Sequence, residues 1–166
     1  MDSKNIGCGI GIVASVLAVV LTVLGIVMGY QVDKGIGSWM DRAQVAADAE
    51  DISTYVKWSM QGLEHYGLTD GYCAIIFKKP DNNLELHYQA YQRIASRADS
   101  LAQIDKASDA YQSGIDDLRG TVREIAQPGF MCMMAQEWIW VTVLWWIDIA
   151  LWLIFGVMCL VSDFWI

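Results

Sequence analysis

Residues 6–30 read IGCGIGIVASVLAVVLTVLGIVMGY, and none of them is charged. At about 1.5 Å per residue, a helix of this length spans the ~30 Å hydrocarbon core of a bilayer. The run is longer than the apolar region of a secretory signal peptide, and no small-residue cleavage motif lies around Tyr30. The sequence therefore predicts an uncleaved transmembrane helix at residues 6–30, preceded by a short tail at residues 1–5.

A second apolar stretch lies near the other end of the sequence. Residues 138–160 read WIWVTVLWWIDIALWLIFGVMCL, with Asp148 as the only charged residue. We expect a second transmembrane helix at residues 138–161 and a short tail at residues 162–166. Residues 31–137 carry nearly all the remaining charge, so we expect them to form an acidic domain in water. The hydrophobic content of 55% agrees with a membrane protein.

The domain at residues 31–137 has the apolar periodicity of α-helices. One stripe follows Ser38 and comprises Val45, Ala49, Ile52, Val56, Leu63 and Tyr66. A second comprises Leu84, His87 or Tyr88, Tyr91, Ala95, Ala98 and Ala102, and a third comprises Tyr111, Ile115, Leu118, Val122 and Ile125. Turns are expected at residues 67–71, where two glycines lie, at residues 80–83, and near residues 104–108, where the phase slips.

These elements predict an all-α protein in which two transmembrane helices flank an extramembrane antiparallel helical bundle. Both spans meet the same membrane face, so the chain must leave that face and return to it. A four-helix bundle satisfies this requirement. The alternative is a long two-helix stalk, in which residues 84–126 form one bent helix and residues 67–83 form its tip.

The charge and cysteine patterns exclude several classes of function. A net charge of −8 argues against nucleic acid or anionic lipid as a partner, because both require a basic face. The four cysteines, at positions 8, 73, 132 and 159, show no metal or redox spacing, and we interpret them as free thiols. The spacing of the residues around His65 and His87 does not match a metal motif. We therefore predict no enzyme, no metal and no cofactor.

The side of the membrane that holds the domain is weakly encoded. Lys4 lies before the first span, whereas Lys34 and Arg42 follow it, so the flanking basic charges are nearly balanced. A short N-terminal tail with a lysine is common on the cytoplasmic side. We therefore expect a two-pass protein whose domain is extracytoplasmic.

Small residues form a stripe along one face of the first span, at steps of 4, 4, 3, 4, 3 and 4 residues. They are Gly7, Gly11, Ser15, Ala18, Thr22, Gly25 and Gly29. A face without bulky side chains allows the backbones of two membrane helices to approach closely. The sequence leaves open whether the second span, a second copy of the chain or a foreign subunit covers this helix-packing face.

Asp148 is a carboxylate near the middle of the second span. A charge at that depth costs at least about 2.5–3.5 kcal/mol, so we expect a protonated Asp148 hydrogen-bonded to Thr22, Ser15 or a partner subunit. A first span with Gly7, Gly9 and Gly11 and a second span with a central carboxylate resemble the two helices of the rotor-ring subunit of rotary ATPases. This resemblance would imply ion handling at Asp148. That family joins its helices by a short polar loop, whereas a whole domain intervenes here, so we do not assign the chain to it.

A basic and aromatic segment interrupts the acidic domain. Lys78 and Lys79 follow Phe77 and lie near Tyr72, and these four residues are a possible docking point for an acidic partner. We expect an accessory or structural subunit of a membrane complex, with other membrane subunits or copies of itself as partners. The alternatives are a ligand-sensing module, whose layout resembles four-helix-bundle chemoreceptor domains, and a homo-oligomeric ion-conducting assembly that uses Asp148.

Overall fold

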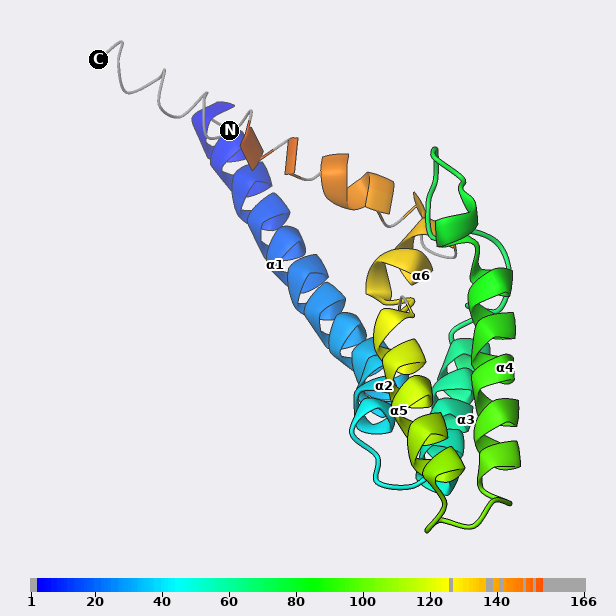
Figure 1. The fold of residues 1–166 in the computed structure, drawn as a ribbon. Coiled ribbons are helices and arrows are strands. Elements are labelled where there is room, and N and C mark those ends of the chain that lie inside the picture. The colour runs from blue at the N-terminus through cyan, green and yellow to red at the C-terminus, as the bar shows by residue number, and fades with distance from the viewer. Residues whose placement is uncertain are drawn as a thin grey trace. The chain divides into compact units, whose positions relative to one another are not determined.

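The structure is a computed structural model in which residues 3–125, 127–136, 139–140, 142–147, 149–150 and 152–153 are described, with side chains from residue 16 onward. The chain divides into two units, Met1–Met28 with Trp138–Ile166, and Gly29–Glu137. The described residues contain the helices α1 to α6, labelled in Figure 1, and no strand. The predicted all-α class is therefore confirmed for this part of the chain.

Helix α1 (Ser3–Gly35) contains the first predicted span and continues beyond it. The helical stretch Val16–Gln44 is long and apolar enough to cross a membrane, and 6% of its most apolar window is buried. It is the one such helix among the described residues. The described residues between 139 and 153 are helical, but much of the second predicted span, including residues 154–161, lies outside the described residues.

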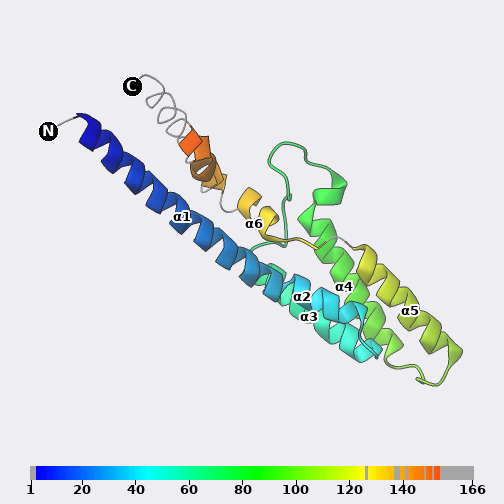
Figure 2. The ribbon, with the colours of Figure 1, turned by 90° about the vertical axis from the view of Figure 1, so that its left-hand side faces the viewer.

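Helices α2 (Gly37–Gln44), α3 (Ala49–His65), α4 (Leu84–Leu101) and α5 (Asp109–Glu124) pack as a closed four-helix bundle, seen in Figures 1 and 2. Each helix contacts the next one, and α5 returns to contact α2. Side-chain hydrogen bonds show that α3 and α4 are antiparallel, because Ser53 near the start of α3, and Lys57 one turn later, pair with Asp99 near the end of α4, whereas Glu64 pairs with Tyr88. The prediction of a bundle is therefore correct. The alternative of a two-helix stalk is wrong, because the chain turns between Leu101 and Asp109.

The predicted apolar stripes form most of the bundle core. The third stripe is confirmed for Tyr111, Ile115, Leu118 and Val122, which are all buried, whereas Ile125 follows the end of α5 and is half-buried. In α4 the buried residues include Leu84, Tyr91, Ala95 and Ala98, and in α3 they include Ala49, Ile52, Val56 and Leu63. The prediction that Val45 belongs to the buried stripe is wrong, because its side chain is 78% exposed. Helix α2 ends at Gln44, so the helical period does not carry across residues 45–48.

The helix ends follow the turn and capping residues of the sequence. The Asn83 side chain accepts a hydrogen bond from the Leu86 amide at 3.2 Å, and Ser108 does the same for the Tyr111 amide at 3.2 Å. Gly67 and Gly71 have φ angles of 67° and 82°, a region that favours glycine. Before Asn83, residues Pro80–Asn82 form a single turn of 3-10 helix, η1.

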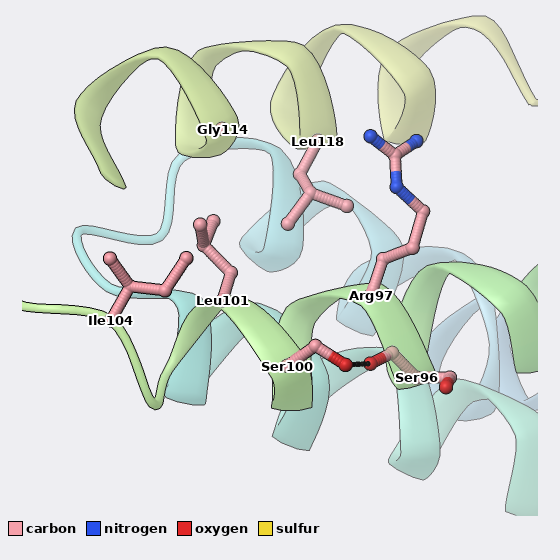
Figure 3. Close-up of a pocket in the computed structure, with 7 residues that line it drawn as sticks. All are labelled: Ser96, Arg97, Ser100, Leu101, Ile104, Gly114 and Leu118. Carbon is pink, nitrogen blue, oxygen red and sulfur yellow. Dashed lines mark hydrogen bonds between the residues drawn. The ribbon is translucent and has the colours of Figure 1, made fainter. Parts of the chain in front are cut away.

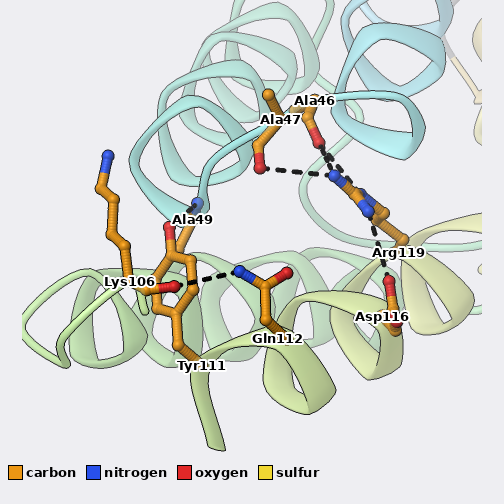
Figure 4. Close-up of polar contacts among 8 residues, drawn as sticks. All are labelled: Ala46, Ala47, Ala49, Lys106, Tyr111, Gln112, Asp116 and Arg119. Atoms are coloured by element: carbon orange, nitrogen blue, oxygen red, sulfur yellow. Dashed lines mark hydrogen bonds and ion pairs between the residues drawn. The ribbon is translucent and has the colours of Figure 1, made fainter. Parts of the chain in front are cut away.

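Polar contacts fasten the α2–α3 connection to α5, as Figure 4 shows. The Arg119 guanidinium donates to the carbonyl oxygens of Ala46, at 2.9 Å from Nε, and Ala47, at 3.3 Å. These carbonyls follow the C-terminus of α2, where a cation is favoured. The Ala49 amide donates to the Tyr111 hydroxyl at 3.2 Å. On the other side of the bundle, hydrogen bonds from Lys57 and Ser53 lower the pKa of Asp99.

Glycine allows α3 to cross the end of α1 at backbone contact. A Cβ atom added to Gly62 would lie 2.2 Å from the Gly35 carbonyl oxygen. Beside this contact, the Ser59 hydroxyl donates to the Ile36 carbonyl at 3.1 Å, and the Tyr66 hydroxyl donates to the Gln31 carbonyl at 3.0 Å. Val32 in the last turns of α1, Ile36 at the junction and Met40 of α2 are buried, so the junction of α1 and α2 belongs to the bundle core.

We predict that Gly62→Ala destabilises the bundle by about 1–3 kcal/mol, because the new methyl group meets backbone atoms that cannot rotate away. The matched control is Gly120→Ala in α5, where no atom lies within 4 Å of the added Cβ. This control should be neutral or stabilising by up to about 1 kcal/mol. Thermal melts of the full chain in mild detergent measure both effects. Equal melting temperatures for the two variants would contradict the close crossing.

Candidate functional site

The small-residue face of α1 is partly covered. Ala18, Gly25 and Gly29 are half-buried, whereas Val19 and Ile26 on other faces are 62% and 68% exposed. Ala18 and Thr22 line an open hollow of about 350 Å³ together with residues near the other end of the chain, namely Trp145, Ile149, Trp152 and Leu153. The structure therefore brings two predicted interface residues next to tryptophans of the second apolar stretch.

The remaining residues of the stripe are placed less fully. Gly7, Gly11 and Ser15 lie on α1, in the part of that helix for which only the backbone is described. Gly29 contacts the Phe130 ring of α6 (Phe130–Gln136), whose Cγ lies 3.7 Å from a Cβ built on that glycine. Asp148 lies outside the described residues. Its hydrogen bond to Thr22 or Ser15 therefore stays a prediction.

A disulfide joins Cys73 to Cys132, with an S–S distance of 2.04 Å. The interpretation of these two cysteines as free thiols is therefore wrong. They are 59 residues apart in the sequence, and no local spacing reveals that the fold brings them together. The bond fastens the α3–α4 connection to α6. Cys159 lies outside the described residues, as does the side chain of Cys8.

The segment at residues 72–79, which contains the four predicted docking residues, is a loop in which residues 75–79 are exposed. Its base is closed by an isolated bridge between Tyr72 and Asn83 and by a hydrogen bond from the Cys73 amide to the Asn82 carbonyl at 2.8 Å. The Asn82 side chain donates to the Phe77 carbonyl at 2.7 Å and accepts from the Lys79 amide at 2.9 Å. The Lys78 ammonium group lies 5.3 Å from the centre of the Tyr72 ring.

An aromatic cluster, absent from the sequence predictions, lies where α2 meets α3. The ring centres of Trp39 and Trp58 are 4.6 Å apart, and Tyr55 lies 5.7 Å from Trp58. The Arg42 guanidinium lies 5.2 Å from the Trp39 ring. Trp58 remains 41% exposed. The three-residue step from Tyr55 to Trp58 on α3 was a signal for this cluster, but the contribution of Trp39 needed the fold.

A shallow groove follows the contact between α4 and α5, and Figure 3 shows one end of it. Two hollows of about 290 and 440 Å³ lie along it, and Arg97 lines both. The Arg97 side chain pairs with Asp117 of α5 at 2.6 Å. Arg93 lines the larger hollow, and apolar residues such as Ile94 and Leu118 form much of the walls.

The histidine and glutamate residues considered in the sequence have other contacts. The His87 ring is 2.9 Å from the Asp81 carbonyl, and Glu64 accepts a short hydrogen bond from the Tyr88 hydroxyl. That hydrogen bond to Glu64 raises the pKa of Tyr88. Among the described residues, no three His, Cys, Asp or Glu side chains are grouped to hold a metal ion.

Comparison with known proteins adds no relative. No protein-family model, curated protein or solved structure matches this chain.

Proposed function

We propose that the chain is an accessory or structural subunit of a membrane complex, anchored by two transmembrane helices at residues 6–30 and 138–161. It acts by helix association in the bilayer and through contacts of its bundle in water. Other membrane subunits or further copies of the chain are its partners.

The observation that carries this proposal is the unburied apolar surface of α1. Its side chains from Val16 to Val27 are mostly exposed, although they are large and hydrophobic. In a bilayer, lipid covers such a surface. The small residues on one side of it favour a helix instead, since close backbone packing supplies the contact that the hydrophobic effect does not supply in lipid.

The aromatic cluster of Trp39, Tyr55 and Trp58 is the favoured protein contact of the bundle. Aromatic residues and arginine are enriched at protein interfaces, where they supply most of the binding energy. Arg42 beside Trp39 gives the cluster both an apolar surface and a charge. This surface suits a partner that offers apolar side chains and a carboxylate.

The Cys73–Cys132 disulfide supports placing the bundle outside the cytoplasm. Disulfides persist in oxidising compartments and are rare where thiols are kept reduced. This argument is independent of the flanking charges, which are nearly balanced. With an extracytoplasmic bundle, both chain ends lie on the cytoplasmic side.

Two other functions remain as alternatives. The groove between α4 and α5, with Arg93 and Arg97, favours a ligand-sensing module that passes its signal to a partner. A homo-oligomeric ion-conducting assembly would use Asp148. The hollow lined by Ala18 and Thr22 is also lined by Ile149, the residue that follows Asp148 in the sequence. The composition of the native particle distinguishes the subunit from the conducting assembly.

We predict that foreign subunits co-purify at a fixed ratio when the protein is extracted from its native membrane in mild detergent. Gly25→Leu should reduce their recovery about tenfold, because bulk on the small-residue face costs about 1–3 kcal/mol of packing. The matched control, Ile26→Phe, adds bulk to the neighbouring exposed residue and should leave recovery unchanged. Quantitative mass spectrometry and particle mass measure both.

A single-component particle of several copies would reject foreign subunits as the partners and leave a homo-oligomer, as the ion-conducting assembly requires. A ligand-dependent rise in melting temperature that Arg93→Ala abolishes would favour the sensor. Equal loss of subunits from the Gly25 and Ile26 variants would show that the small-residue face is not the contact.

We predict that Cys73 and Cys132 are found bonded in protein taken from the native membrane after free thiols are blocked. Peptide mass spectrometry without reductant should give one linked peptide pair. The double variant Cys73→Ser, Cys132→Ser should lose about 2–4 kcal/mol of stability. Quantitative alkylation of both thiols in the native membrane would place the bundle in a reducing compartment and contradict its extracytoplasmic side.

A further inference from the structure

One end of the bundle is held close to the membrane by the chain itself. The first span is expected to end at Tyr30, and the Phe130 ring of α6 packs against Gly29, one residue earlier. Cys132 of α6 precedes Trp138, where the second span is expected to begin, by six residues. Six residues extend at most about 20 Å, and about 9 Å as a helix. Helix α6 therefore lies at the membrane surface if both spans form.

The exposed loop at residues 72–79 is fastened to this same end. The Cys73–Cys132 disulfide joins the start of the loop to α6. Gln136 lies two residues before Trp138, and its side chain donates a hydrogen bond to the Asp70 carbonyl oxygen, which lies just before the loop. Both links lie within the bundle unit. They fasten the loop to Cys132 and Gln136, which precede the expected start of the second span by six and two residues.

The side chains of the loop are unusual for a surface in water. Ile75, Ile76 and Phe77 are 51%, 79% and 75% exposed, and they are consecutive. Met131 of α6 is also 75% exposed. Lys78 and Lys79 follow directly and are exposed as well. Within the described part of the chain, neither lysine forms an ion pair with an acidic residue, in contrast to Lys57 and Lys106.

This combination matches the interfacial zone of a bilayer. Apolar side chains gain free energy where they enter the boundary between headgroups and acyl chains, and adjacent lysines contact lipid phosphates. The net charge of −8 does not oppose this contact, because the loop presents its own basic residues and is tethered beside the bilayer. The loop is held in shape by Asn82, so little order has to be gained on insertion.

We propose that residues 75–79 form a membrane-docking loop, in which Ile75, Ile76 and Phe77 enter the bilayer interface and Lys78 and Lys79 bind anionic lipid phosphates. The disulfide holds the loop at the depth where this contact can form. This inference rests on the two-span anchoring of the proposed function, and it reassigns the basic segment from an acidic protein partner to lipid.

A fluorescent label tests the docking directly. Ile76→Cys and, as a matched control, Val45→Cys are made in the full chain with Cys8→Ser and Cys159→Ser, and are labelled without reductant with an environment-sensitive dye. The two sites are apolar and equally exposed, at 79% and 78%. Val45 lies in the α2–α3 connection, at the opposite end of α3 from the loop. Mass spectrometry verifies that the Cys73–Cys132 bond is retained.

The labelled proteins are placed in nanodiscs of phosphatidylcholine and phosphatidylglycerol. Dye at residue 76 should emit at shorter wavelength than dye at residue 45, be quenched several-fold more by spin-labelled lipid, and be shielded from iodide. Lys78→Glu with Lys79→Glu should reduce the lipid quenching, and more so with phosphatidylglycerol than with phosphatidylcholine alone. Equal behaviour of the labels at 76 and 45 overturns the proposal, and an unchanged lysine variant overturns the phosphate contact.

Failure of docking is distinguishable from failure of the two-span anchor. Six of the eight tryptophans lie in residues 138–166, so their quenching by spin-labelled lipid in unlabelled protein reports whether that stretch is in the bilayer. Quenched tryptophans with an unquenched label at residue 76 reject the docking loop alone. Unquenched tryptophans reject the anchor on which the inference rests.

Discussion

The contact of Gly62 with the Gly35 carbonyl group is the point on which the bundle is built. It lets α3 lie at backbone distance from the end of α1, and Val32, Ile36 and Met40 fill the space beside it. Helix α4 then packs on α3, and α5 closes the ring against α4 and α2. Any larger residue at position 62 would push α3 away from the chain that enters the bundle.

Much of the fold follows from periodicity and from turn chemistry. The step of three and four residues from Tyr111 to Val122 predicts a buried face because α5 is uninterrupted, and Asn83 and Ser108 fix helix starts by bonds within three residues. The errors come from places where the period is broken or shared. Val45 follows a helix end, so its step of four to Ala49 has no meaning, and the core role of Val32 and Ile36 was hidden by their proximity to the apolar span.

The candidate surfaces divide in the same way. The small-residue face of α1 is a local pattern on one helix, so the sequence gives its members, whereas the tryptophans opposite Ala18 and Thr22 depend on tertiary packing. The Cys73–Cys132 bond joins residues far apart in the chain and carries no local signal, and only the fold brings Trp39 to Tyr55 and Trp58. The disulfide matters most for the proposed function, because it supports an extracytoplasmic bundle and fastens the loop at residues 72–79 to α6.

The central claim is that two apolar segments cross the bilayer and hold a water-exposed bundle between them. Hydrogen–deuterium exchange of the full chain in bilayer nanodiscs, resolved by peptide, tests it most directly. We expect residues 6–30 and 138–161 to stay protected after the exposed loops, including residues 102–108, have exchanged, because the hydrocarbon core excludes water. Exchange of residues 138–161 at the rate of those loops would contradict the two-pass anchor.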